Sequence, residues 1–457
     1  MKSKLVVFLF TFISIYIFFN REDWKQNIYE YDVDGYYTYL PALFLYHDLG
    51  KMGFHHQAHI DFGVTEDTYY IYDQPLTGRR TNMYAIGTSL FELPFFLVAW
   101  AWSDHVDGYN PDGYSTPFQI AGHFSNIFWV MLGLFVLRRF LKAYFTDTVT
   151  ALVLVCIALG TNLYTYTIFS AGMSHPYVFF ILACMLYYTQ RWYAQGKPAQ
   201  LYMLGMLAGL AVITRPIAII AFLIPLLWEV NSVQLLRLRF AFLAKQGKNI
   251  AIAALFFLAV AMIQMSYWKY TAGHWVFFSY QHDGFTFLRP KIWDGLFSYR
   301  KGWFVYTPMA LLGMAGLFFL WKKHKTLAPA FILYFMIIIY VVFSWRNWWY
   351  GGGFSARGMI DSLSVMALPL GMFIEWIISL KRKLATTAML VVCTAFITLN
   401  MFQSYQYALW ILHCERMTKT FYWKIFGKTK INNAEVDRYL MSEHDYNEEV
   451  KDRFDNK

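Results

Sequence analysis

The stretches LVVFLFTFISIYIFF (residues 5–19) and FILYFMIIIYVVF (residues 331–343) decide the fold class of this chain. Runs of this kind are buried stably only in lipid or in a very large protein core. The rest of the composition agrees, because 58% of the 457 residues are hydrophobic, 21% are aromatic and only 15% are charged. A soluble domain carries about 25% charged residues. The composition excludes a disordered or nucleic-acid-binding chain and predicts an all-α polytopic membrane protein.

Apolar runs separated by polar segments predict about eleven transmembrane helices. Their approximate ranges are 4–19, 118–137, 149–169, 175–189, 201–213, 217–230, 250–266, 303–321, 327–344, 359–378 and 384–401. The segment 83–102 is also apolar, but it contains Glu92 and Pro94 and ends in Trp-Ala-Trp. We therefore expect residues 83–102 to form an interfacial or re-entrant helix that does not cross the membrane.

Clusters of lysine and arginine set the predicted orientation. They follow alternate spans, at 138–142, 191–197, 237–248, 322–325 and 381–383. Such loops stay on the cytoplasmic side of a bacterial inner membrane, so most of the net charge of +10 reflects topology and not an acidic partner. The predicted membrane domain, residues 1–401, then exposes periplasmic segments and a periplasmic tail, which are 20–117, 267–302, 345–358 and 402–457.

The first external segment contains a pair of carboxylates in the motif YDVDGYYTYLP, residues 31–41. Asp32 and Asp34 lie on one face if the chain is extended and point apart if it is helical. Paired carboxylates at a membrane surface can share a proton, hold a metal or act as a general base toward a sugar hydroxyl. A solvated Asp-Gly turn is the alternative interpretation.

Basic residues on the external side are candidates for binding an anion, because positive charge is disfavoured there. They are Arg79, Arg80, Arg215, Arg300, Lys301 and Arg357. For the Arg79–Arg80 pair, contact with lipid phosphates is an equally good explanation. Arg357 follows three glycines, residues 351–353, and glycine lets a backbone approach a ligand closely.

Other external residues are candidates for contacts with a sugar or an acceptor. These are Asp48, His175, Trp345, Trp348 and Tyr350. An aromatic belt at the interface explains the tryptophans equally well, and His175 fits an interfacial hydrogen bond. His55, His56 and His59 contain one helical i, i+4 pair, but no second ligand cluster accompanies them, so we predict no metal ligands there.

Four motifs, in their order along the chain, resemble the GT-C superfamily of membrane glycosyltransferases. The resemblance is to bacterial relatives of the protein mannosyltransferases and the lipid A aminoarabinose transferase. The motifs are DGYYTYLP (34–41), YAIG (84–87), GLAVITRP (209–216) and GGGFSAR (351–357). The resemblance implies a helical membrane domain with interfacial helices in a long first external loop. It also implies transfer of a sugar from a polyprenyl-phosphate donor to a glycan, lipid or protein acceptor.

The resemblance implies that Asp34 is the general base and Asp32 its neighbour. The protein mannosyltransferases carry adjacent Asp-Glu, whereas Val33 separates the two acids here, so which of them acts stays open. Inverting transfer also requires positively charged groups beside the departing lipid phosphate, which gains negative charge. The external arginines and Lys301 can supply this positive charge, and a divalent cation, Mg²⁺ or Mn²⁺, is the open alternative.

Two other functions compete with glycosyl transfer. A transporter or flippase for a lipid-linked sugar predicts repeated halves with broken helices and midplane charges, and the sequence shows neither a repeat nor deep acidic pairs. An assembly or anchoring protein would use the tail, residues 402–457, to bind a partner.

Overall fold

A computed structural model describes residues 1–62, 69–281 and 283–455. Residues 63–68 and 282 belong to the predicted external segments, and residues 456–457 end the tail, so those parts of the predictions lie outside the described residues. The described chain is helical apart from one two-stranded antiparallel hairpin. The all-α class is therefore confirmed in outline, and the hairpin is an element that the sequence analysis did not predict.

The N-terminal part contains the two carboxylates. Its elements are α1 (Lys2–Arg21), η1 (Asp23–Lys25), α2 (Tyr31–Tyr37), α3 (Tyr39–Phe44), α4 (His55–Phe62), β1 (Ile71–Gln74), β2 (Arg79–Asn82), α5 (Gly87–His105) and α6 (Thr116–Leu141). Helices α1 and α6 are antiparallel, because Arg138 donates to Ser3 at 2.7 Å and the rings of Phe18 and His123 lie 5.0 Å apart. The intervening chain leaves and rejoins this pair at the same end, as expected if α5 does not cross.

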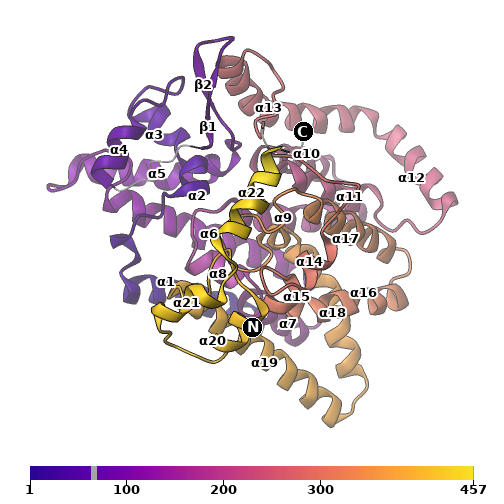
Figure 1. Cartoon of the computed structure of the whole chain (residues 1–457). Helices are drawn as coiled ribbons and strands as arrows, with labels where there is room; N and C mark the ends of the chain where they lie inside the picture. Colours follow the sequence, from indigo (N-terminus) through magenta and orange to yellow (C-terminus); the bar gives the residue numbers. More distant parts are fainter. Residues whose placement is uncertain (63–68, 282, 456–457) are drawn as a thin grey trace.

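The middle and C-terminal parts follow α6 as a larger set of helices (Figure 1). They are α7 (Asp147–Leu159), α8 (Leu163–Ile168), α9 (Ser174–Gln195), α10 (Pro198–Thr214), η2 (Pro216–Phe222), α11 (Leu223–Leu226), α12 (Val233–Lys245), α13 (Gly247–Ala272), α14 (Ile292–Phe297), α15 (Trp303–Tyr306), α16 (Met309–Lys323), α17 (Ala328–Phe343), η3 (Arg357–Ser362), α18 (Leu363–Ser379), α19 (Lys383–Ala408), α20 (Lys419–Ile425), α21 (Asn433–Tyr439) and α22 (Glu443–Asp455).

Five helices in the described part of the chain are long and apolar enough to cross a membrane. They are Lys2–Arg21, Thr116–Leu141, Gly247–Ala272, Arg357–Ser379 and Lys383–Ala408. Shorter apolar helices are Asp147–Leu159, Pro198–Thr214, Pro216–Leu226 and Ala328–Phe343. The chain is thus a helical protein with membrane-length helices, and the prediction of about eleven spans is met only in part.

Three predicted spans are not continuous helices. The span 149–169 is interrupted between Leu159 and Leu163, the span 217–230 is a 3-10 helix followed by a single helical turn, and the span 303–321 is divided between α15 and α16. Pro308 lies between α15 and α16, and Pro216 is the first residue of η2, after the end of α10. Proline lacks an amide hydrogen and clashes with the preceding turn, which explains why α15 does not continue into α16 and why α10 does not continue into η2.

The hairpin and the start of α5 are bonded to the last turns of α13. The Thr77 hydroxyl donates to the carbonyl of Thr271, and the Asn82 amide donates to the Tyr267 hydroxyl at 2.8 Å. Farther along, the Ile86 amide donates to the Gln264 side chain at 2.7 Å. These bonds satisfy backbone groups that a short, exposed hairpin would otherwise leave to solvent. They fix the first external segment to the end of a membrane-length helix.

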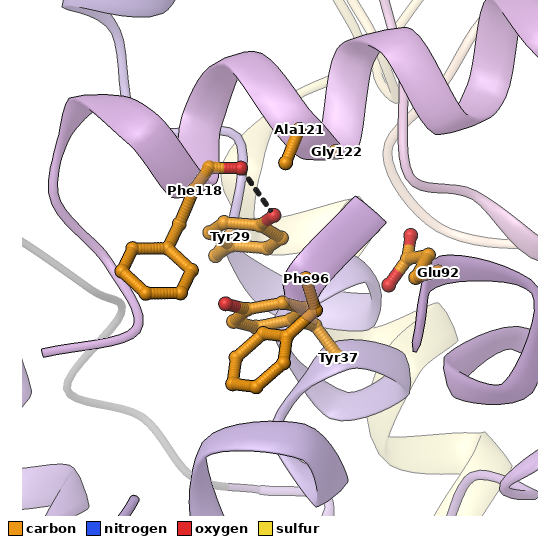
Figure 2. A pocket seen from close by; sticks show the side chains of 7 residues that line it. All are labelled: Tyr29, Tyr37, Glu92, Phe96, Phe118, Ala121 and Gly122. Atoms are coloured by element: carbon orange, nitrogen blue, oxygen red, sulfur yellow. Dashed lines mark hydrogen bonds between the residues drawn. The ribbon is translucent and has the colours of Figure 1, made fainter. Parts of the chain in front are cut away.

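The back of α2 packs in a tight aromatic cluster between α5 and α6, around a hollow too small to hold a water molecule (Figure 2). The rings of Tyr29 and Tyr37 stack 3.7 Å apart, and the Tyr29 hydroxyl donates to the carbonyl of Phe118 at 2.9 Å. Glu92 lies beside the hollow and accepts a hydrogen bond from Tyr177 at 3.0 Å. This packing sets the direction in which α2 presents its carboxylates.

The C-terminal tail is packed against the membrane helices. Helix α19 continues to Ala408, beyond the predicted boundary at 401, and Gln403 and Gln406 in its last turns are buried. Gln403 donates to the Tyr422 hydroxyl at 2.7 Å, and Gln406 donates to the Ile425 carbonyl at 2.8 Å. The described part of the tail therefore packs on the end of α19.

Candidate active site

The carboxylate motif is helical. Because α2 spans Tyr31–Tyr37, Asp32 and Asp34 point to different sides of the helix and do not form the one-faced pair that an extended chain would give. The two acids consequently lie in different environments, and each can be assigned its own neighbours.

Asp32 is an ion-paired carboxylate that keeps some contact with solvent. Its Oδ2 lies 2.5 Å from Nη2 of Arg357, and its side chain is 16% exposed. Tyr69 donates to Oδ1 at 2.6 Å, and the Tyr84 hydroxyl donates to the same oxygen. Burial raises the pKa of Asp32, but the Arg357 charge and the two hydroxyl donors outweigh it and hold the pKa below its usual value. Asp32 is therefore ionised at neutral pH.

Asp34 is completely buried. The Tyr70 hydroxyl donates to Oδ2, the Tyr114 hydroxyl donates to Oδ1 at 3.4 Å, and Nε2 of His55 lies 3.4 Å from Oδ2. Burial raises the pKa of Asp34 above its usual value, although His55 and the hydroxyls act in the opposite direction. The acid that the sequence resemblance favours as the base is thus the less accessible of the two.

His55 contributes to the environment of Asp34 and not to a histidine cluster. It is buried and also lies 2.9 Å from the Thr38 hydroxyl, whereas His56 is exposed. Within the described residues, no group of three or more His, Cys, Asp or Glu side chains is arranged to hold a metal ion. The sequence analysis examined His55 only as a zinc ligand and missed its contact with Asp34.

Arg357 and Lys301 meet at the triple-glycine loop. Nη1 of Arg357 donates to the Gly352 carbonyl at 3.2 Å, and Nζ of Lys301 donates to the Gly353 carbonyl. A Cβ on Gly353 would lie 2.6 Å from the Tyr166 hydroxyl, so only glycine brings the backbone this close. The loop thus acts as a backbone bridge between the two cations.

Lys301 is a predicted phosphate ligand whose buried charge is not paired with an acidic side chain among the described residues. It is only 2% exposed, and it forms no ion pair with an acidic residue in the part of the chain that the structure describes. Burial lowers the pKa of Lys301 to about 7, with only partial compensation from its neighbours. An incoming anion would favour the charged form of this ammonium group.

A second ion pair lies where the N-terminal end of α9 and the C-terminal end of α10 meet η3. Asp361 contacts Nε of Arg215 at 2.9 Å through Oδ2 and Nδ1 of His175 at 2.8 Å through Oδ1. Arg215 also donates to the Ser174 hydroxyl at 3.3 Å. Nε2 of His175 is buried and has no hydrogen-bond partner among the described residues. The sequence analysis found Arg215 and His175 but missed Asp361, the carboxylate that joins them.

Tyr36 connects the two ion pairs. Its hydroxyl lies within electrostatic range of Arg215, Asp32 and Arg357. The side chain is buried on the face of α2 toward α9. The structure therefore brings five predicted site residues into one polar region, namely Asp32, His175, Arg215, Lys301 and Arg357, with Asp34 buried beside it.

Arg79 and Arg80 form contacts that hold the hairpin. Arg79 donates to the Tyr270 carbonyl at 2.8 Å, and its guanidinium lies 4.1 Å from the centre of the Tyr270 ring. Arg80 forms an exposed ion pair with Asp73 at 3.0 Å. These contacts hold the hairpin and the end of α13, so the geometry gives neither arginine a place beside Asp32.

Arg300 faces the tail. Its Nε donates to the Glu415 carbonyl at 2.8 Å, its Nη1 lies 2.7 Å from Oε2 of Glu449, and its guanidinium lies 3.8 Å from the centre of the Trp349 ring. Trp348 lies at the edge of the same contact, 5.8 Å from the guanidinium. A buried arginine whose charge is already neutralised is poorly suited to bind a donor phosphate.

The remaining predicted sugar-contact residues have local structural roles. Asp48 accepts hydrogen bonds from the amides of Lys51 at 3.1 Å and Gly53 at 2.7 Å, which closes a turn. The ring of Trp345 lies 5.7 Å from that of Tyr280, and the Tyr350 hydroxyl donates to the carbonyl of Val342 at 3.0 Å. These contacts stabilise the external loops.

The chain matches no protein-family model and no curated protein. Its function is therefore inferred from the site itself.

Proposed function

We propose that this protein is a membrane glycosyltransferase of the GT-C type, which transfers a sugar from a polyprenyl-phosphate donor to an acceptor at the periplasmic face of the bacterial inner membrane. One observation supports the proposal most strongly. An ionised, partly accessible carboxylate, Asp32, contacts Arg357, which shares a glycine loop with the buried and uncompensated Lys301. A base and an anion site side by side are what transfer from a phosphate leaving group requires.

Accessibility favours Asp32 over Asp34 as the base. A general base must come within hydrogen-bond reach of the acceptor hydroxyl, and Asp34 has no exposed surface. Both oxygens of each acid already have hydrogen-bond or ion-pair partners, so exposure is what distinguishes them. In the proposal, Asp32 takes the acceptor proton, and Asp34 holds α2 in position.

The charges balance in an inverting displacement. The acceptor oxygen forms a bond to the anomeric carbon, the bond from that carbon to the lipid phosphate breaks, and the acceptor proton moves to Asp32. Negative charge that develops on the leaving phosphate is stabilised by Lys301 and Arg357, with Arg215 on the other side of Tyr36. The isoprenoid tail would stay in the lipid, which explains a site at the ends of membrane-length helices.

The test uses the full-length protein purified into lipid nanodiscs. A panel of polyprenyl-phosphate sugars is offered with glycan, lipid and peptide acceptors, and release of polyprenyl phosphate is measured with and without a chelator that removes Mg²⁺ and Mn²⁺. Asp32→Asn should abolish release, while Asp48→Asn, a matched change in the same external segment, should leave it intact. Full activity of Asp32→Asn would contradict the proposal.

A flippase for a lipid-linked sugar is the second candidate, because the helix interruptions between α7 and α8 and at η2 are typical of transporters. Reconstituted vesicles containing a fluorescent lipid-linked sugar distinguish the two functions. Movement of the lipid between leaflets without release of lipid phosphate would support the flippase.

A further inference from the structure

The start of the C-terminal tail exposes an unusual number of large aromatic side chains. Trp410 is 74% exposed and Trp423 is 56% exposed, and Leu409 and Phe426 are also open to the surroundings. Such residues rarely gather on a surface that faces water. Tryptophan is enriched where a protein meets the boundary between lipid and water.

The end of α19 holds this part of the tail in place. The Gln406 side chain donates to the carbonyls of Ile425 and Lys428, both at 2.8 Å, and Gln403 donates to Tyr422. Figure 1 shows α20 near the C-terminal end of α19, a helix that is long and apolar enough to cross a membrane. We call residues 409–430 the tail anchor.

A hollow of about 120 Å³ opens between α20 and α21, in the same part of the tail as these aromatic residues. Its apolar lining includes Ile425, Ile431 and Val436, and its rim includes Lys424, Lys428 and Lys430. Lys428 and Lys430 are exposed, and the charged residues among its described lining are all lysines. The lysines could contact an anionic group while the apolar lining contacts hydrocarbon.

We propose that this hollow binds the phosphate headgroup of an anionic phospholipid, in the leaflet where α19 ends, and that the tail anchor lies on the membrane surface. An acidic protein would complement the lysines but would not explain the exposed tryptophans beside them. A lipid explains both, since Trp410 and Trp423 would enter the interface while Lys428 and Lys430 meet the phosphate. The position directly after a membrane-length helix brings the anchor to that surface.

The test places a fluorophore on the tail of the full-length protein in nanodiscs. Cys414→Ser leaves three buried cysteines, so a label attaches at an introduced Thr429→Cys in the anchor or, as a control, at Asn447→Cys on the exposed side of α22. Nanodiscs contain headgroup-quenching lipids, either zwitterionic throughout or with phosphatidylglycerol. Quenching at 429 should exceed that at 447 and should increase with the anionic lipid.

Charge variants test whether the hollow causes this preference. Lys428→Gln/Lys430→Gln should lower the preference for phosphatidylglycerol by about five-fold for each lysine, the effect expected of one basic residue at an anionic surface. Arg438→Gln/Lys451→Gln removes the same charge from exposed tail positions outside both the anchor and the hollow and should change little. Lys428→Arg/Lys430→Arg should retain the preference.

Any one of four results would overturn the proposal. The first is equal quenching at 429 with and without phosphatidylglycerol, and the second is an equal effect of the two charge-removing double substitutions. The third is a change in the fluorescence of the label at 429 on adding an acidic peptide, in nanodiscs where lipid quenchers have no effect, which would assign the hollow to a protein. Soluble glycerol phosphate should not reproduce the lipid effect, and saturation by it alone would assign the hollow to a free phosphate.

Discussion

Asp32 and Asp34 belong to one turn of α2, yet they occupy opposite environments. Asp32 pairs with Arg357 and retains some exposure, whereas Asp34 is closed in by Tyr70, Tyr114 and His55. Their pKa values move in opposite directions for this reason. The comparison shows that a carboxylate motif does not identify the accessible acid, because a shift of two positions along a helix decides which carboxylate is closed in.

The largest expected effect separates these two acids directly. Asp32→Asn should lower the turnover of the proposed transfer by about 1,000-fold, the contribution expected of a general base. Asp34→Asn should lower turnover far less and should instead lower thermal stability, because a buried site built for a carboxylate loses part of its hydrogen bonding. Release of polyprenyl phosphate and thermal unfolding are measured on both variants. A greater loss of turnover in Asp34→Asn would reverse the assignment.

Asp361 sharpens the comparison, because it is ion-paired like Asp32 and buried like Asp34. Asp361→Asn leaves the Arg215 charge without its partner and weakens the contact to His175, so unfolding should become easier by about 3 kcal/mol. Chemical unfolding of the purified protein measures this change. Ser174→Ala removes only one contact of Arg215 and should cost about 1 kcal/mol. An equal loss in the free energy of unfolding for the two variants would show that the ion pair stabilises the fold no more than a single hydrogen bond.

Lys301 extends the comparison from acids to cations. Its pKa is about 7, so the charged form that attracts phosphate predominates below pH 7 and is lost above it. Donor affinity should therefore fall by up to about ten-fold for each pH unit above 7, and binding should take up a proton. The arginine of Lys301→Arg stays charged over this pH range, so the donor affinity of the variant should depend little on pH. The KM for the donor, measured from pH 6 to 9 as the range around this pKa, checks the prediction.

The smallest effect is expected at the neighbouring Arg300. Because its charge is neutralised by Glu449 and its ring contact is with Trp349, Arg300→Gln should leave turnover within about two-fold while loosening α22 from the domain. Protease cleavage of the tail measures the loosening. A loss of donor binding comparable to that of Lys301→Gln would return Arg300 to the phosphate site.

Much of the architecture follows from apolar runs and charge parity. Both depend on lipid as a solvent, and α1, α6, α13 and α19 correspond to predicted spans. The break at Pro216 was predicted, but the interruption at Gly160 was not, because hydropathy averages over the residues that break a helix. The hairpin was missed because its bonds go to Tyr267, Thr271 and Gln264, far away in the sequence.

The site could be predicted in part for a similar reason. Arg357, Lys301 and Asp32 were noticeable as charges in external loops, but Tyr69, Tyr70 and Tyr84 were lost among 34 tyrosines. Asp361 could have been predicted from the sequence, because an acidic residue at the start of an apolar run often belongs to a functional site. Arg300 was assigned to the phosphate because no sequence pattern shows that Glu449 folds back onto it.

The bonds between the hairpin and α13 also have a mechanical consequence. Helix α13 has 26 residues, more than the roughly 20 needed to cross a bilayer, and a long helix tilts as the membrane becomes thinner. Tilting α13 pulls on Asn82, whose side chain holds the backbone amide of Tyr84 at 2.9 Å. Tyr84 in turn donates to Asp32. A change in bilayer thickness that tilts α13 would therefore be transmitted to the Asp32 carboxylate through the hydrogen bonds of Asn82 and Tyr84.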